Sequence, residues 1–205
     1  MSVDVIDNNA TGESATAAFI VRLQWITIAW MCLELFVAAF AGVRACSVAL
    51  TAFAGDSAIE LFSAMVVLRR FHIGIAAEKS AARMTSILLY LLAAYILISS
   101  SVALLSHRLE AKPSYIGIGL LIAASIIMPL LGRAKRRLAF ETGSKALKAD
   151  ATQSSVCAYM SWIALAGLGM NAVFHLPWMD SAAALLLIPL VVKEANDARR
   201  GKACC

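Results

Sequence analysis

Two carboxylates, Asp56 and Glu60, stand in the middle of an otherwise apolar stretch, AFAGDSAIELFSAMVVL, at residues 52–68. An ionised carboxylate at the centre of a membrane-spanning helix costs about 2.5–3.5 kcal/mol on insertion scales, so the pair must face protein or water. Because the two residues are four apart, both project from one helical face, as two oxygen ligands of one cation would. The pair therefore predicts a cation site, with a polar contact between helices as the alternative.

A second polar set occurs later in the chain, in KALKADATQSSVCAYMSWIALAG. Asp150, Gln153 and Cys157 are spaced by three and four residues, which places them on one stripe of a helix. At 1.5 Å per residue, Asp56 lies about 15 Å from the outer start of its span and Cys157 about 12 Å from the inner start of its own. In an apolar core of about 30 Å these depths meet near the midplane. Carboxylate oxygens and a thiolate at one depth predict a divalent-metal site, with Asp56, Glu60, Cys157, Gln153 and Asp150 as candidate ligands.

Further acidic residues have weaker signals. Glu34 lies alone in the first apolar run, where it is either a proton relay or a protonated acid that hydrogen-bonds a neighbouring helix. Asp180 begins the last apolar run and is expected to be an interfacial or capping residue. Of the two, Glu34 is therefore the one that stays a candidate functional residue.

The elements that must position these residues follow from composition. Of the 205 residues, 61% are hydrophobic and 15% are charged, whereas about 25% are charged in a typical soluble domain. The pattern predicts an all-α, polytopic membrane protein with six transmembrane helices in a domain over 18–195. We expect a disordered cytoplasmic tail at 1–17 and a short cytoplasmic tail at 196–205. The six apolar runs are 18–42, 46–68, 84–106, 114–132, 151–174 and 178–192.

Basic residues predict the orientation of the chain in the membrane. Fourteen of the eighteen Lys and Arg fall on one side, in the connections after the second and fourth runs and in the C-terminal tail. The positive-inside rule assigns this side to the cytoplasm, so both termini are expected there, in a multi-pass protein of a plasma or bacterial inner membrane. The net charge of +5 is explained by this topology, so we expect lipid and no nucleic acid as a partner.

The segment SVALTAFAGDSAIELFSAMVVLRR (47–70) resembles the second helix of the cation diffusion facilitator family of divalent-metal/proton antiporters. KALKADATQSSVCAYMSWIALAG and LPWMDSAAALLL are similar to its fifth and sixth helices. The resemblance covers most of the chain after residue 18 and implies a homodimer and a short form without the family's C-terminal cytoplasmic domain. It implies a transport site of two acidic residues on the second helix, matched by Asp56 and Glu60. A His and an Asp complete the site on the fifth helix, matched in position by Gln153 and Cys157.

The expected function is secondary transport, in which a divalent transition or heavy metal leaves the cytoplasm as protons enter. Zinc or cadmium is the first expectation, and the thiolate of Cys157 also suits the softer mercury ion. The metal ion is cargo, so no resident cofactor is expected. No Cys–His or His–carboxylate constellation lies at span depth, so an enzyme is not expected. A non-transporting metal-binding or regulatory membrane subunit is the alternative.

Overall fold

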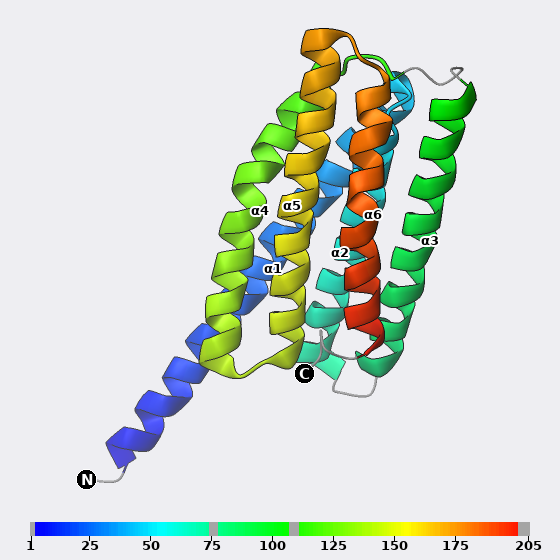
Figure 1. Ribbon diagram of the computed structural model, residues 1–205. Coiled ribbons are helices and arrows are strands. Elements are labelled where there is room, and N and C mark those ends of the chain that lie inside the picture. Colours follow the sequence, from blue (N-terminus) through cyan, green and yellow to red (C-terminus); the bar gives the residue numbers. More distant parts are fainter. Residues whose placement is uncertain (1–2, 74–77, 107–110, 201–205) are drawn as a thin grey trace.

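A computed structural model describes residues 3–73, 78–106 and 111–200, and the chain is all-helical throughout these ranges (Figure 1). The six helices are α1 (Val3–Ala45), α2 (Val48–Ile73), α3 (Glu78–Ser106), α4 (Tyr115–Thr142), α5 (Lys145–Phe174) and α6 (Trp178–Arg199). The all-α prediction is therefore confirmed. Helix α1 includes most of the segment for which the sequence predicts a disordered tail. That segment has no proline and a single glycine, Gly12, so a helix can extend through it from the apolar span.

Within the described residues, five helices are long and apolar enough to cross a membrane, which makes this an all-α, multi-pass membrane protein. Their apolar spans are Ala18–Ala45, Val48–Val66, Arg83–Leu105, Tyr115–Thr142 and Asp150–Phe174. Helix α6 carries Asp180, Lys193 and Glu194 within its 22 residues and is not among the five. The sixth span, expected at 178–192, stays a prediction.

Helix α2 is the central element of the bundle. It packs against α1, α3, α5 and α6, while α4 packs against α5 and α1. In the span of α2, 61% of the residues are buried, compared with 33–44% in the other four spans. A polar side chain on α2 is therefore surrounded mainly by protein.

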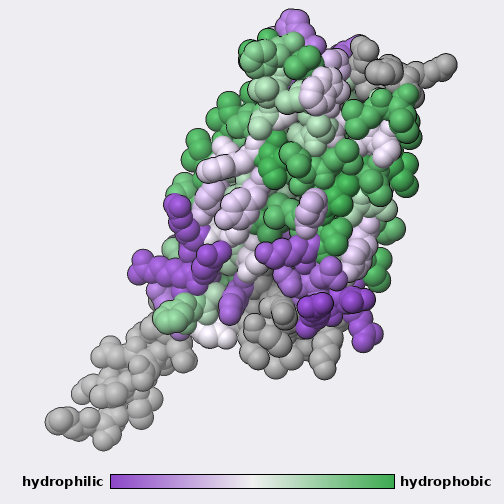
Figure 2. Space-filling view, in the orientation of Figure 1, coloured by the Kyte–Doolittle hydropathy of each residue, from purple (hydrophilic) through white to green (hydrophobic). Residues whose placement is uncertain are grey.

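The two ends of the bundle differ in polarity. The start of α1, the end of α6 and the connection between α4 and α5 lie at the same end (Figure 1). Figure 2 shows most of the hydrophilic residues gathered at this end, a few more at the opposite end, and a largely hydrophobic surface between them. Exposed basic side chains there include Arg133, Arg136 and Arg137. A polar end beside an apolar belt is the surface that a membrane-embedded bundle requires.

Helices α5 and α6 approach each other closely at a glycine. A Cβ atom added to Gly167 would lie 2.4 Å from the Cβ of Ala183. Only glycine fits at such a separation, as is common where membrane helices pack. This contact holds α5 at its position between α4 and α6.

The N-terminus of α2 is capped by a residue of α6. Ser47 Oγ donates a hydrogen bond to Asp180 Oδ1 at 2.6 Å, and the backbone N–H groups of Val48 and Ala49 donate to Asp180 Oδ2 at 2.8 and 3.3 Å. The carboxylate thus satisfies donors that a helix leaves unpaired at its start, and its charge suits the positive end of the helix dipole. Asp180 is a capping residue, as the sequence suggested, but the helix it caps is α2.

Candidate metal-ion site

Four acidic residues meet inside the bundle. They are Glu34 of α1, Asp56 and Glu60 of α2, and Asp150 of α5, and each is 0% exposed. Ionised groups are almost never fully buried unless other groups compensate their charge. The four residues therefore mark a functional or structural polar centre in an otherwise apolar core.

Several carboxylate oxygens in this centre accept no hydrogen bond of ordinary geometry among the described residues. They are both oxygens of Asp56, Oε1 of Glu34, Oε2 of Glu60 and Oδ1 of Asp150. The second oxygen of Glu34 accepts a hydrogen bond from Ser57 Oγ at 3.3 Å. Buried polar atoms without a partner are rare in proteins. A cation or protons could satisfy these oxygens.

The thiol of Cys157 belongs to the same cluster. Cys157 is fully buried on α5, and its side chain interacts with those of Asp56 and Glu60. Glu34 also acts on it electrostatically. The structure thus brings Asp56, Glu60, Cys157 and Glu34 together from three helices. Of these, the sequence placed only Glu34 outside the ligand set.

Gln153 lies one turn before Cys157 on the same helix. It is 6% exposed, and its Nε2 has no hydrogen-bond acceptor among the described residues. A neutral amide oxygen is a weak ligand for zinc. Gln153 is positioned near the cluster without a contact that assigns it a role.

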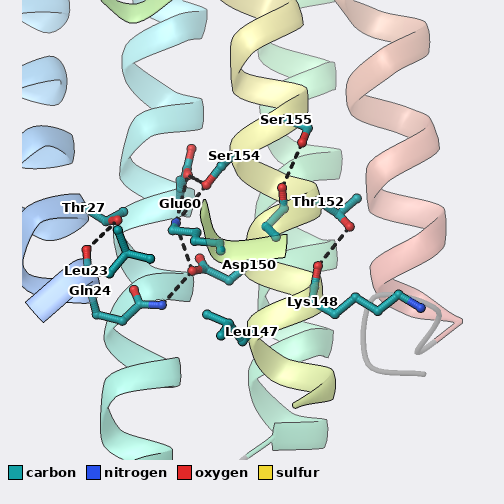
Figure 3. A network of polar contacts seen from close by, with 12 residues as sticks. Leu23, Gln24, Thr27, Glu60, Leu147, Lys148, Asp150, Thr152, Ser154 and Ser155 are labelled. Carbon is teal, nitrogen blue, oxygen red and sulfur yellow. Dashed lines mark hydrogen bonds and ion pairs between the residues drawn. The ribbon is translucent and has the colours of Figure 1, made fainter. Parts of the chain in front are cut away.

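Asp150 is held in a separate polar network, part of which Figure 3 shows. Its Oδ2 accepts a hydrogen bond from Gln24 Nε2 of α1 at 2.9 Å and lies 2.9 Å from the ammonium nitrogen of Lys135 of α4. The Lys135 nitrogen also donates to Ser154 Oγ at 2.8 Å. Asp150 is thus paired with a basic residue, while the sequence predicted it as a candidate metal ligand.

The network and the cluster meet at Glu60. Ser154 Oγ donates to Glu60 Oε1, and the Lys135 nitrogen lies 3.7 Å from the same oxygen. Glu60 thus presents one oxygen to Lys135 and Ser154, while its Oε2 accepts no hydrogen bond of ordinary geometry in the described part of the chain and could accept a cation.

A metal ion would require some rearrangement of these side chains. Among the side chains that the structure describes, no group of three or more His, Cys, Asp and Glu is arranged to hold one. No protein-family model and no curated protein matches this chain. The cation diffusion facilitator resemblance therefore rests on the motifs around Asp56, Glu60, Gln153 and Cys157.

Sequence reasoning missed Lys135, which it counted among the basic residues on the cytoplasmic side. In the structure α4 continues to Thr142, so Lys135 lies on the helix and not in the connection after it, and it is 0% exposed. Its place was recoverable from helical periodicity. Met128, Leu131, Lys135 and Leu138 recur every three or four residues and are all buried.

Glu194 of α6 is a second residue that the sequence analysis did not select. Its Oε2 is buried with no partner among the described residues, and Asp56 and Glu60 act on it electrostatically. It was counted with the C-terminal charged segment because it directly follows Lys193. Glu194 extends the acidic centre toward the hydrophilic end of the bundle.

Proposed function

We propose that this protein is a secondary transporter of the cation diffusion facilitator type, which exports a divalent metal ion from the cytoplasm in exchange for protons. Zinc or cadmium is the first candidate cargo, and mercury is a softer alternative. The observation that carries this proposal is Asp56. It is fully buried on the central helix, neither of its oxygens accepts a hydrogen bond of ordinary geometry among the described residues, and the Cys157 thiol beside it is a weak donor.

The charges of the cluster support exchange of metal for protons. With Asp56, Glu60 and Cys157 deprotonated, the cluster carries three negative charges, of which a divalent cation would neutralise two. Metal ligands must be deprotonated, so metal binding releases protons and metal departure allows proton uptake. Glu34 is proposed as the proton relay because it is the third carboxylate beside Cys157. Gln153 is proposed to orient the metal or a water molecule bound to it.

The proposed orientation has six spans and both termini in the cytoplasm of a cell-membrane protein. The hydrophilic end of the bundle supports it, because exposed arginines lie beside the connection between α4 and α5. A homodimer is proposed from the family resemblance. A transporter so oriented would bind metal from the hydrophilic end and release it at the end where Asp180 caps α2.

Labelling of the native Cys46 tests this orientation. Cys46 is exposed at the turn between α1 and α2, at the end opposite the start of α1. In a variant with Cys204→Ser and Cys205→Ser, a membrane-impermeant maleimide should label Cys46 in intact cells. In a second variant with Cys46→Ala and Glu141→Cys added, the exposed position at the hydrophilic end should be labelled only after permeabilisation. The reverse labelling pattern would mean that the protein has the opposite orientation and carries metal into the cytoplasm.

A flux assay tests the function itself. In proteoliposomes, the wild-type protein should move zinc or cadmium, and an opposing proton gradient should accelerate the movement, because protons replace the metal at the same ligands. Magnesium should not be moved, because a thiolate ligand favours softer ions. The readouts are a metal-sensitive dye and a pH-sensitive dye inside the vesicles.

Two outcomes would contradict antiport. Metal binding without flux would support the alternative, a non-transporting metal-binding or regulatory membrane subunit. Metal flux that is the same with and without the proton gradient would show transport without proton coupling.

A further inference from the structure

Lys135 is the only basic side chain among the described residues that forms ion pairs inside the acidic centre. It reaches from α4 into the space between α2 and α5, and its side chain is 0% exposed. Its nitrogen is 2.9 Å from Asp150 Oδ2 and 3.7 Å from Glu60 Oε1. The ammonium group therefore sits between a residue of the polar network and a residue of the candidate metal site.

The neighbouring residue shows that this burial is specific. Like Lys135, Arg136 donates a hydrogen bond from α4 to a serine of α5, in this case Ser155 Oγ at 2.9 Å. The side chain of Arg136, however, is exposed. A lysine near a helix end can usually extend its head group to water along its flexible stem. Lys135 instead points into the bundle, where three polar groups surround its nitrogen.

We propose that Lys135 is a tethered counter-cation that competes with the transported metal ion for Glu60. This inference rests on the proposed metal site. In the metal-free protein the ammonium group and the hydroxyl of Ser154 hold Glu60 Oε1, which leaves Oε2 for a ligand. When a divalent ion binds Glu60, repulsion moves the ammonium group toward Asp150, with which it already makes its shorter contact.

The consequence is a limit on metal affinity. Two cations that share one carboxylate repel each other strongly in a buried site, because little water screens them. When metal is bound, the ammonium group of Lys135 pairs with Asp150 alone. Gln24 holds Asp150 in place for this contact, because its Nε2 donates a hydrogen bond to Asp150 Oδ2. A metal held less tightly leaves more readily, which a transporter requires.

Zinc affinity of detergent-solubilised variants, measured by competition with a zinc-chelating dye, tests this competition. Lys135→Met removes the charge but keeps a long apolar side chain, and it should tighten zinc binding by about tenfold or more. Asp150→Asn removes the other ion-pair partner of Lys135. The ammonium group then pairs with Glu60 alone, so zinc binding should weaken by about tenfold. The matched control Arg136→Met should bind zinc as the wild type does.

The double variant Lys135→Met with Asp150→Asn covers the case in which Lys135→Met alone fails to fold. It removes both charges of the Lys135–Asp150 pair together, so Asp150 is not left ionised without its partner, and it should bind zinc as tightly as Lys135→Met. Unchanged or weaker affinity in the double variant would overturn the proposal, because a structural ion pair or a metal-ligating Asp150 would give that result. Wild-type protein that binds no divalent metal would instead refute the proposed function, and with it this inference.

Discussion

Substitution of Asp56 by Asn is expected to lower metal flux in proteoliposomes by about 100-fold or more, which corresponds to about 2.7 kcal/mol. Asn has nearly the same shape but cannot carry the negative charge that neutralises a cation. Neither oxygen of Asp56 accepts a hydrogen bond of ordinary geometry in the described part of the chain, and the amide oxygen of Asn can still face the Cys157 thiol, which is a weak donor beside it. Asp56→Asn protein should therefore insert in the membrane and unfold in detergent as the wild type does.

The matched control for this loss is Glu141→Gln. Glu141 is an exposed acid of α4 whose ion-pair partner, Arg137 at 2.9 Å, is also exposed. The same change from an acid to an amide at this position should leave flux unchanged. Flux near the wild-type level in Asp56→Asn would remove Asp56 from the transport site and, with it, the main support for metal transport.

Substitution of Asp180 by Ala is expected to lower the free energy of unfolding by about 2–3 kcal/mol, because it leaves buried donors without an acceptor. The carboxylate accepts hydrogen bonds from Ser47 Oγ and from the N–H groups of Val48 and Ala49. These bonds join the start of α2 to α6, so their loss should loosen the central helix at that end. Unfolding of the purified protein in detergent, induced by denaturant, gives the measurement.

A graded series separates capping from general disruption. Asp180→Asn keeps one side-chain oxygen and should lose about half as much stability as Asp180→Ala. Glu141→Gln should change stability by less than about 0.5 kcal/mol, since exposed ion pairs contribute little. Equal stability of Asp180→Ala and the wild type would show that the cap contributes nothing to the fold.

The sequence alone determined that this protein folds in a membrane and that the carboxylates within its spans face the interior of the bundle. An apolar chain with long uncharged runs can satisfy its backbone in a membrane only as helices or a closed barrel, and the length of the runs favours helices. Asp56 and Glu60 had to face protein or water because lipid cannot solvate a carboxylate. The shared stripe of Asp150, Gln153 and Cys157 followed from helical geometry. These inferences depend on local spacing and on the cost of burial, which a sequence displays directly.

Only the tertiary structure decided which partners the charges have. Lys135 has a flexible stem, so its position on α4 permitted either an exposed or a buried head group. The packing of α4 against α5 places that head group near Asp150 and Glu60, which are 15 and 75 residues away along the chain. The cap of α2 by Asp180 likewise joins residues 131–133 apart in sequence. Such contacts depend on how whole helices pack, and the spacing of residues within one helix cannot show them.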